Sequence, residues 1–284
     1  MDILINETPV DFDYAGKTIR VVVQEVDREL ERINHVITGV SVNSTEIHTD
    51  FDKFAEQVLK SEDKLTITTE AVSELNAKAI EIVLKLLMLV EENQELTEVR
   101  EAWENFTKTF FSFFSAEECS FLENLGTMIK KPEETGAAER MKRCRELSLF
   151  FKERLDECVR PVEALNSAEQ LFLTLKAELS NTSVLLQTGK EAQAIKNITL
   201  LIEIINKVTR IMPEYFIALR IAEEPIVNGE PLLAFFGHFN ANLNDLIASF
   251  ENKDTVLLGD LIEYEILPKL EALFTSLKTY QKQG

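Results

Sequence analysis

Two short glycine–lysine stretches invite comparison with phosphate-binding loops. Gly16-Lys17-Thr18 resembles the end of a Walker A motif, but the glycine required five residues before Gly16 is replaced by Asp11. Gly189-Lys190 fails in the same way, because Val184 stands where that glycine is needed. Such loops cradle phosphate only when the complete glycine pattern follows a strand and opens a helix. We therefore expect no nucleotide site, and we interpret Gly189 as the end of one helix before another that starts at Lys190.

The histidines offer little acid–base or metal chemistry. There are three of them, His35, His48 and His238. None has the partner spacing of HExxH or ExxH metal sites. His238 is the best pocket candidate, because Phe235 and Phe239 lie close to it in the sequence. A position on a helix surface or in a hydrogen-bonded core is favoured instead, since nothing nearby would orient the ring or use its proton.

The carboxylates and thiols also lack a catalytic pattern. The densest acidic cluster consists of Asp254, Asp260, Glu263 and Glu265. Asp260 and Glu263 share a helix face, but a two-metal carboxylate site needs Glu-x-x-His helices that are missing here. The chain has no GxSxG motif and no cysteine close to a histidine. We therefore nominate no catalytic residue, no metal ligand and no cofactor, and an enzyme is the less favoured class.

A basic cluster stands out from an acidic background. Six cations fall within sixteen residues: Lys130, Lys131, Arg140, Lys142, Arg143 and Arg145. Such a cluster could receive an acidic partner or another copy of the chain. A solvated loop and helix start is the favoured interpretation, because exposed lysines and arginines are common in such places. The first five of these residues are kept as candidate partner contacts.

The densest aromatic stretch is KTFFSFFSAEECSF, residues 108–121. One helical stripe precedes and enters it: Trp103, Phe106, Phe110, Phe113 and Phe114. Ser115-Ala-Glu-Glu118 then has capping-box spacing, which predicts a new helix from about 116 to a terminal glycine at Gly126. The stretch is thus a helix corner whose rings are mostly core. Phe111 lies at the edge of the stripe and is predicted to be its most exposed ring and a partner contact.

The overall composition disfavours several classes of partner. The chain of 284 residues has 49 acidic and 30 basic side chains, for a formal net charge of −19. This field repels phosphate backbones and anionic lipids, so neither nucleic acid nor membrane is an expected partner. The longest apolar run, residues 80–90, is far shorter than the roughly 20 residues of a membrane span. With no signal-peptide pattern and three cysteines without disulfide or zinc spacing, we expect a cytoplasmic protein.

The elements that must position these residues fall into two parts. Residues 1–70 show the order β-α-β-α-β, with strand-like alternation through Val10 and Phe12, a helix at 17–33 and a strand at 64–70. After residue 70 nearly all the patterns are helical. The predicted fold class is α+β, with a small mixed α/β module at 1–70 and an all-α multi-helix bundle at 71–284. A subdivision of the bundle near 130–137 is left open.

Local patterns also predict where some helices of the bundle begin and end and which residues form its core. Ser167 begins a capping-box pattern and is predicted to start a helix, and Pro268 is predicted to end or kink the last one. Separate helices are expected before and after Pro213. One continuous stripe is predicted to be core: Ile195, Ile198, Leu201, Ile202, Ile205, Val208 and Met212.

Three classes of function remain. The favoured one is a non-catalytic interaction protein, an adaptor or chaperone-like bundle that holds a partner protein in a groove or along a helix face. The second is a sensor or enzyme with a small-molecule pocket between helices. The third is a self-assembling structural protein, so a homo-oligomer stays open.

Overall fold

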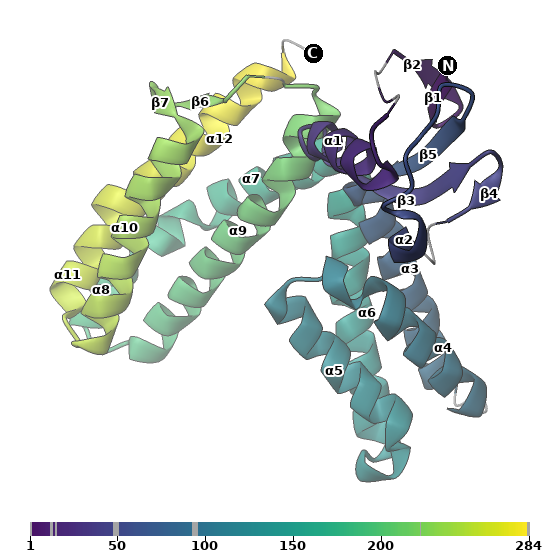
Figure 1. The fold of residues 1–284 in the computed structure, drawn as a ribbon. Helices are drawn as coiled ribbons and strands as arrows, with labels where there is room; N and C mark the ends of the chain where they lie inside the picture. Colours follow the sequence, from purple (N-terminus) through teal and green to yellow (C-terminus); the bar gives the residue numbers. More distant parts are fainter. Residues whose placement is uncertain are drawn as a thin grey trace. The chain divides into compact units, whose positions relative to one another are not determined.

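The computed structural model describes residues 2–11, 14, 16–47, 51–92, 96–221 and 223–282. Phe12 and His48, which the sequence singled out, lie outside the described residues. The predicted α+β class is confirmed: a five-stranded mixed sheet is followed by a large helical part (Figure 1). The chain forms two compact units, Met1–Val159 and Arg160–Gly284. The last strand of the sheet ends close to residue 70, and the boundary between the two units falls between residues 159 and 160 of the chain.

The sheet of the first unit contains more strands than the sequence predicted. Its elements are β1 (Asp2–Ile5), β2 (Thr8–Val10), α1 (Ile19–Glu31), β3 (His35–Val42), β4 (Thr45–Glu46), α2 (Phe51–Phe54) and β5 (Lys64–Ala71). The strand order is β2-β1-β5-β3-β4, with β1 parallel to β5 and the other pairs antiparallel. The predicted order β-α-β-α-β was therefore incomplete. Two of the segments predicted as single strands each form a hairpin of two strands, β1 with β2 and β3 with β4.

Two tight turns account for the extra strands. Asn6 and Glu7 join β1 to β2 with φ values of 47° and 65°, and Asn43 and Ser44 join β3 to β4 with φ values of 50° and 68°. Positive φ at both central residues is the geometry of a type I′ turn, which suits the twist of a two-residue hairpin. Neither turn contains glycine, so the strongest sequence signal for such a turn was missing.

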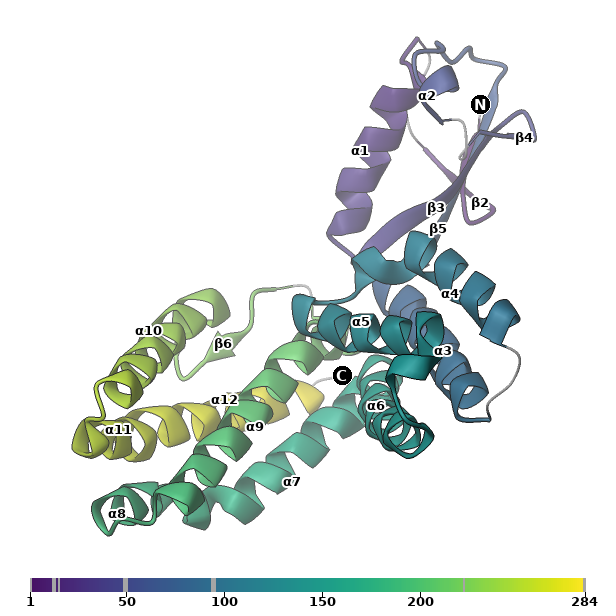
Figure 2. The same cartoon turned by 90° about the horizontal axis from the view of Figure 1, so that it is seen from below.

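Helix α1 packs its apolar face against this sheet (Figure 2). The predicted helix at 17–33 is confirmed, with two fewer residues at each end. Thr18 caps it by accepting a hydrogen bond from the backbone N–H of Val21. The residues that α1 buries are Ile19, Val22, Val26 and Leu30. They contribute to one core with sheet residues such as Leu65 and Ile67, which holds the module together.

Four helices complete the first unit: α3 (Val72–Glu91), α4 (Leu96–Phe110), α5 (Ala116–Lys130) and α6 (Ala137–Val159). Their shared core contains Trp103, Phe106, Leu122 and Phe151. The predicted corner between α4 and α5 is confirmed, with a 3-10 turn at Phe111–Phe113 and both hydrogen bonds of the capping box between Ser115 and Glu118. The predicted end of α5 at Gly126 was wrong, because the helix continues to Lys130.

The second unit is helical apart from one short hairpin. Its elements are α7 (Pro161–Ser180), α8 (Thr182–Gln187), α9 (Glu191–Ala218), β6 (Ile226–Val227), β7 (Glu230–Pro231), α10 (Leu232–Glu251), α11 (Thr255–Asp260), a π-helical turn (Leu261–Ile266) and α12 (Leu267–Gln281). One hydrophobic core joins these helices. The predicted break at Gly189 is confirmed, and this glycine has a φ of +75°. Among the described residues, no helix is long and apolar enough to cross a membrane.

Prolines in this unit act differently from the sequence prediction. Helix α7 begins at Pro161, so Ser167 lies inside it and donates a hydrogen bond to the carbonyl of Glu163 rather than capping a new helix. A first-turn proline is favourable because its missing N–H has no helical partner there. Pro213 does not divide α9, and Pro268 lies in the first turn of α12, directly after the π-helical turn.

Candidate functional site

An apolar groove runs between α9 and α10 in the second unit. One hollow of about 230 Å³ is lined by residues of both helices and by Leu258. A second hollow of about 250 Å³ shares Ile195, Phe250 and Leu258 with the first and extends toward α8 and the start of α11. The apolar side chains that line the first hollow define what we call the α9–α10 groove: Ile195, Ile198, Ile202, Leu246, Ile247, Phe250 and Leu258.

The groove exposes several large apolar side chains. Four of its large side chains are about half exposed: Ile195 (48%), Ile202 (46%), Ile247 (56%) and Phe250 (52%). The sequence predicted Ile195 and Ile202 to be core, and this was wrong. The rest of that stripe is buried, because the neighbouring helices cover only part of the apolar face of α9. Exposed apolar patches of this kind commonly mark interaction sites.

Charged residues lie at one end of the groove and next to its residues in the chain. Glu191, Lys253 and Asp254 line its α8–α11 end. Asp254 is already engaged as a cap, since its side chain accepts the backbone N–H of Leu257 at 3.0 Å. Glu203 and Glu251 are exposed and follow the groove residues Ile202 and Phe250 directly in the chain. These carboxylates, on a chain with a net charge of −19, favour cationic groups on anything that binds there.

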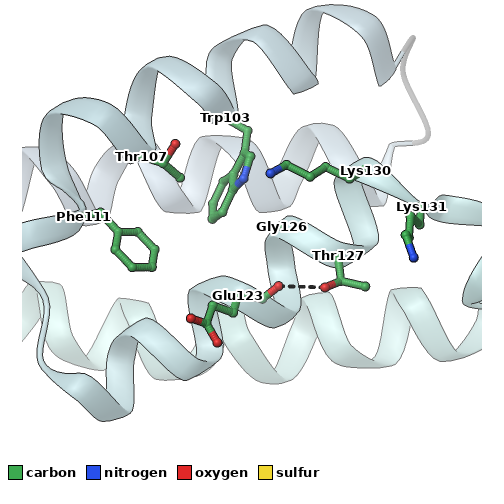
Figure 3. A pocket seen from close by; sticks show the side chains of 8 residues that line it. All are labelled: Trp103, Thr107, Phe111, Glu123, Gly126, Thr127, Lys130 and Lys131. Atoms are coloured by element: carbon green, nitrogen blue, oxygen red, sulfur yellow. Dashed lines mark hydrogen bonds between the residues drawn. The ribbon is translucent and has the colours of Figure 1, made fainter.

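A second concave site lies between α4 and α5 in the first unit (Figure 3). This α4–α5 pocket has a volume of about 490 Å³. Its lining residues are Trp103, Thr107, Phe111, Glu123, Gly126, Thr127, Lys130 and Lys131. The pocket therefore brings together three of the predicted partner contacts, Phe111, Lys130 and Lys131. Phe111 is half-buried, and so are Phe110, Phe113 and Phe114.

Most of the basic cluster is neutralised by nearby carboxylates. Lys131 pairs with Glu134 at 2.8 Å. Three further cations of α6 form ion pairs: Arg143 with Glu139 (2.8 Å) and Lys142 with Glu146 (3.9 Å) on the same helix, and Arg145 with Glu91 of α3 (3.2 Å). Arg140, Lys142 and Arg143 do not line the α4–α5 pocket. In the part of the chain that the structure describes, Lys130 has no ion-pair partner, which sets it apart from Lys131.

The other predicted pocket residues are not brought together. His238 is exposed, and its Nδ1 lies 3.0 Å from a carboxylate oxygen of Glu230. Phe235 and Phe239 are each only 1% exposed and stack within the core. Phe235 and Phe239 are four residues apart and share the buried side of α10, whereas His238 precedes Phe239 by one residue, about 100° around the helix, and is exposed. The sequence could not separate these two faces, because aromatic residues occupy both.

The acidic cluster near the C-terminus serves local structure. Glu265 pairs with Lys269 at 2.7 Å and accepts a hydrogen bond from Asn242 at 2.9 Å. The hydrogen bonds from Lys269 and Asn242 lower the pKa of Glu265. Within the described ranges, no group of three or more histidine, cysteine, aspartate or glutamate side chains is placed to hold a metal ion. The three cysteines are free thiols, and burial raises the pKa of both Cys119 and Cys144.

Comparisons with known proteins divide the chain in a similar way. Residues 163–276 match the family model described as "Domain of unknown function (DUF8042)", a range that contains the α9–α10 groove. No curated protein and no solved structure matches the chain. Residues 1–71, which span the whole five-stranded sheet, match the model described as "TP0873 N-terminal domain". The chain is thus similar to two described domains, each over a part of its length, and the α4–α5 pocket lies between the two matches.

Proposed function

We propose that the chain is a non-catalytic, cytoplasmic interaction protein that holds an amphipathic helix of a partner protein in the α9–α10 groove. The observation that carries this proposal is the row of four large apolar side chains, each about half exposed, along one groove. Removing apolar surface from water is the main driving force of association. A hydrophobic groove is a common receptor for the apolar face of an amphipathic helix.

The spacing of the groove residues suits a short helix. Ile195 and Ile202 are seven residues apart on α9, which corresponds to about 10 Å along the helix axis. Ile247 and Phe250 line the opposite wall at a spacing of one turn. A partner helix that presents apolar residues at positions i, i+3, i+4 and i+7 would fill this length with one continuous stripe.

The charges around the groove define the partner further. Glu191 lines one end of the groove, and the exposed Glu203 and Glu251 follow groove residues in the chain, whereas Asp254 is engaged in capping α11. Lysine or arginine residues beside the apolar stripe of the partner would therefore be attracted, and matching acidic residues would be repelled. Screening by salt should slow such an association, because exposed charges act over a Debye length of about 10 Å at 0.1 M.

The test is affinity capture from native lysate with matched variants. Ile202→Asp and Phe250→Asp place a charge in the groove, and Leu233→Asp is the control, because Leu233 is 80% exposed on α10 and lies outside the groove. The expected result is a protein that the wild type and Leu233→Asp retain but that both groove variants lose. A synthetic helix from that protein should then bind the purified chain. Equal retention by all four proteins, or loss with Leu233→Asp as well, contradicts the proposal.

Sedimentation of the purified protein separates this function from self-assembly. A partner-binding groove predicts a particle that stays monomeric in the absence of the partner. A dimer that forms with rising concentration and disappears in Phe250→Asp would instead assign the groove to a second copy of the chain. That result would replace partner binding by self-association.

A further inference from the structure

We infer that the α4–α5 pocket is a binding site for a small monocarboxylate with a flat apolar body. The site lies in the first unit and does not depend on the function proposed for the α9–α10 groove. Its volume of about 490 Å³ lies within the usual range for small-molecule sites, about 300–1,000 Å³. The walls of the pocket, its unused hydrogen-bond donors and its charge all favour such a ligand.

Aromatic rings from α4 and from the turn after it form the apolar part of the pocket. Trp103 is only 3% exposed, so its ring is fixed by the core, and the small part that is accessible lines the hollow. Phe111 stands at the other end of the pocket (Figure 3). Gly126 has no side chain, which lets the indole ring lie directly against the backbone of α5. Rigid aromatic walls with a gap between them favour a flat apolar group.

Two donors that line the pocket have no partner within the described residues. The ammonium group of Lys130 extends toward Trp103 in Figure 3 and forms no ion pair there, and the indole N–H of Trp103 donates to no acceptor. The main chain around Lys130 is held in place, because Arg100 donates to the carbonyl oxygens of Ile129 (3.2 Å) and Lys130 (3.1 Å). A carboxylate oxygen is the acceptor that best satisfies an ammonium and a neutral N–H together.

The remaining polar groups limit the charge of the ligand. Lys131 is paired with Glu134, so it adds little positive charge to the pocket. Glu123 lies toward the Phe111 end (Figure 3), where it would repel a second anionic group. The hydroxyls of Thr107 and Thr127 already donate to backbone carbonyls of Glu104 and Glu123. Lys130 can neutralise one negative charge of a ligand, and Glu123 would repel a second. The pocket therefore favours a ligand with a single negative charge over phosphate esters and dicarboxylates.

The intrinsic fluorescence of Trp103 reports this site directly, because it is the only tryptophan in the chain. Three probes share one body: 4-phenylbutyrate, its neutral amide and the cationic 4-phenylbutylamine. We expect 4-phenylbutyrate to change the emission of Trp103 and to bind about tenfold tighter than the amide, as one charge-assisted hydrogen bond allows. The amine should bind most weakly. Equal binding of the three probes, or no response to any of them, overturns the inference.

Two lysine variants locate the effect. Lys130→Met should reduce the affinity for 4-phenylbutyrate to that of the amide and leave binding of the amide unchanged. Lys131→Met is the matched control and should keep the preference, because Lys131 is held by Glu134. Both lysines are exposed, so the variants should melt like the wild type, which circular dichroism checks. If Lys130→Met retains the preference for the carboxylate, or if Lys131→Met loses it, the assignment of the anion to Lys130 is wrong.

Discussion

Gly126 in the middle of α5 lies directly against the indole ring of Trp103. A Cβ atom at position 126 would be 2.8 Å from Cζ2 and 3.0 Å from Cε2 of that ring. Such distances are too short for carbon atoms in contact, whose optimum is about 3.5–4.0 Å. The glycine therefore permits the close approach of α4 and α5 rather than ending the helix.

Gly126→Ala should destabilise the first unit although alanine is the better helix former. Overpacking costs about 1–3 kcal/mol, and the gain in helix propensity is about 1 kcal/mol, so we expect a net loss of about 1 kcal/mol. Urea denaturation measures the loss, and a shifted Trp103 emission would report the displaced ring. Gly136→Ala is the control, because nothing lies within 4 Å of a Cβ atom there. Unchanged stability together with unchanged emission would contradict the contact.

Gly259→Ala should have a larger effect in the second unit. A Cβ atom at 259 would lie 2.5 Å from Cβ and 2.8 Å from Cα of Ser183, so α11 could not stay against α8 without a movement of the backbone. We expect a loss of about 2–3 kcal/mol in the free energy of unfolding, at the upper end of overpacking costs. Gly237→Ala in α10 meets nothing within 4 Å and should instead stabilise by about 0.5–1 kcal/mol. Equal urea midpoints for the two variants would refute this distinction.

The two serines with capping-box spacing should respond differently to alanine. Ser115→Ala removes a cap that accepts the backbone N–H of Glu118 at 3.2 Å, and it should cost about 1 kcal/mol. Ser167 lies inside α7 and only donates to the carbonyl of Glu163, so Ser167→Ala should change stability by less than about 0.5 kcal/mol. Thermal unfolding of both variants against the wild type decides this. If Ser167→Ala costs as much as Ser115→Ala, Ser167 would act as a helix cap, as the sequence predicted.

The buried ion pair between α5 and α6 should make stability depend on acid pH. Burial alone would raise the pKa of Glu118, but Arg154, whose Nε lies 2.7 Å from the carboxylate, and Ser115 outweigh this and lower it. A carboxyl with a depressed folded pKa contributes stability above its unfolded pKa of about 4.3. That contribution is lost as the pH falls through the lower folded value.

Glu118→Gln tests this contribution because glutamine can keep the capping box without the charge. Arg154 also pairs with Glu157, so the loss at pH 7 should be moderate, about 1–3 kcal/mol for one charge-assisted hydrogen bond. Below the unfolded pKa of about 4.3 the difference from the wild type should shrink, and it should vanish once the pH is below the depressed folded pKa, where Glu118 is protonated in both states. Urea denaturation across this range measures it. A difference that stays constant into strong acid would show that charge is not the cause.

Local patterns in the sequence were sufficient for much of the architecture. The change of period after residue 70 predicted the two-part α+β fold, because strands and helices impose different spacings on their apolar residues. The cap at Ser115 and the break at Gly189 were predicted correctly, since each depends on residues within a few positions. The type I′ hairpins were missed, because Asn6 and Asn43 adopt positive φ without the glycine that usually signals such turns.

Only the tertiary structure decided what each apolar face contacts. Ile195 and Leu201 belong to the same stripe, yet Ile195 is 48% exposed and Leu201 is fully buried. The local patterns at Gly126 and Ser167 predicted a helix end and a helix start, and both predictions were wrong, because each residue lies within a helix. Burial depends on which neighbouring helix covers a position, and that neighbour is distant in sequence. The sequence by itself therefore determined the helices and their period, and the packing of distant segments determined the groove and the pocket.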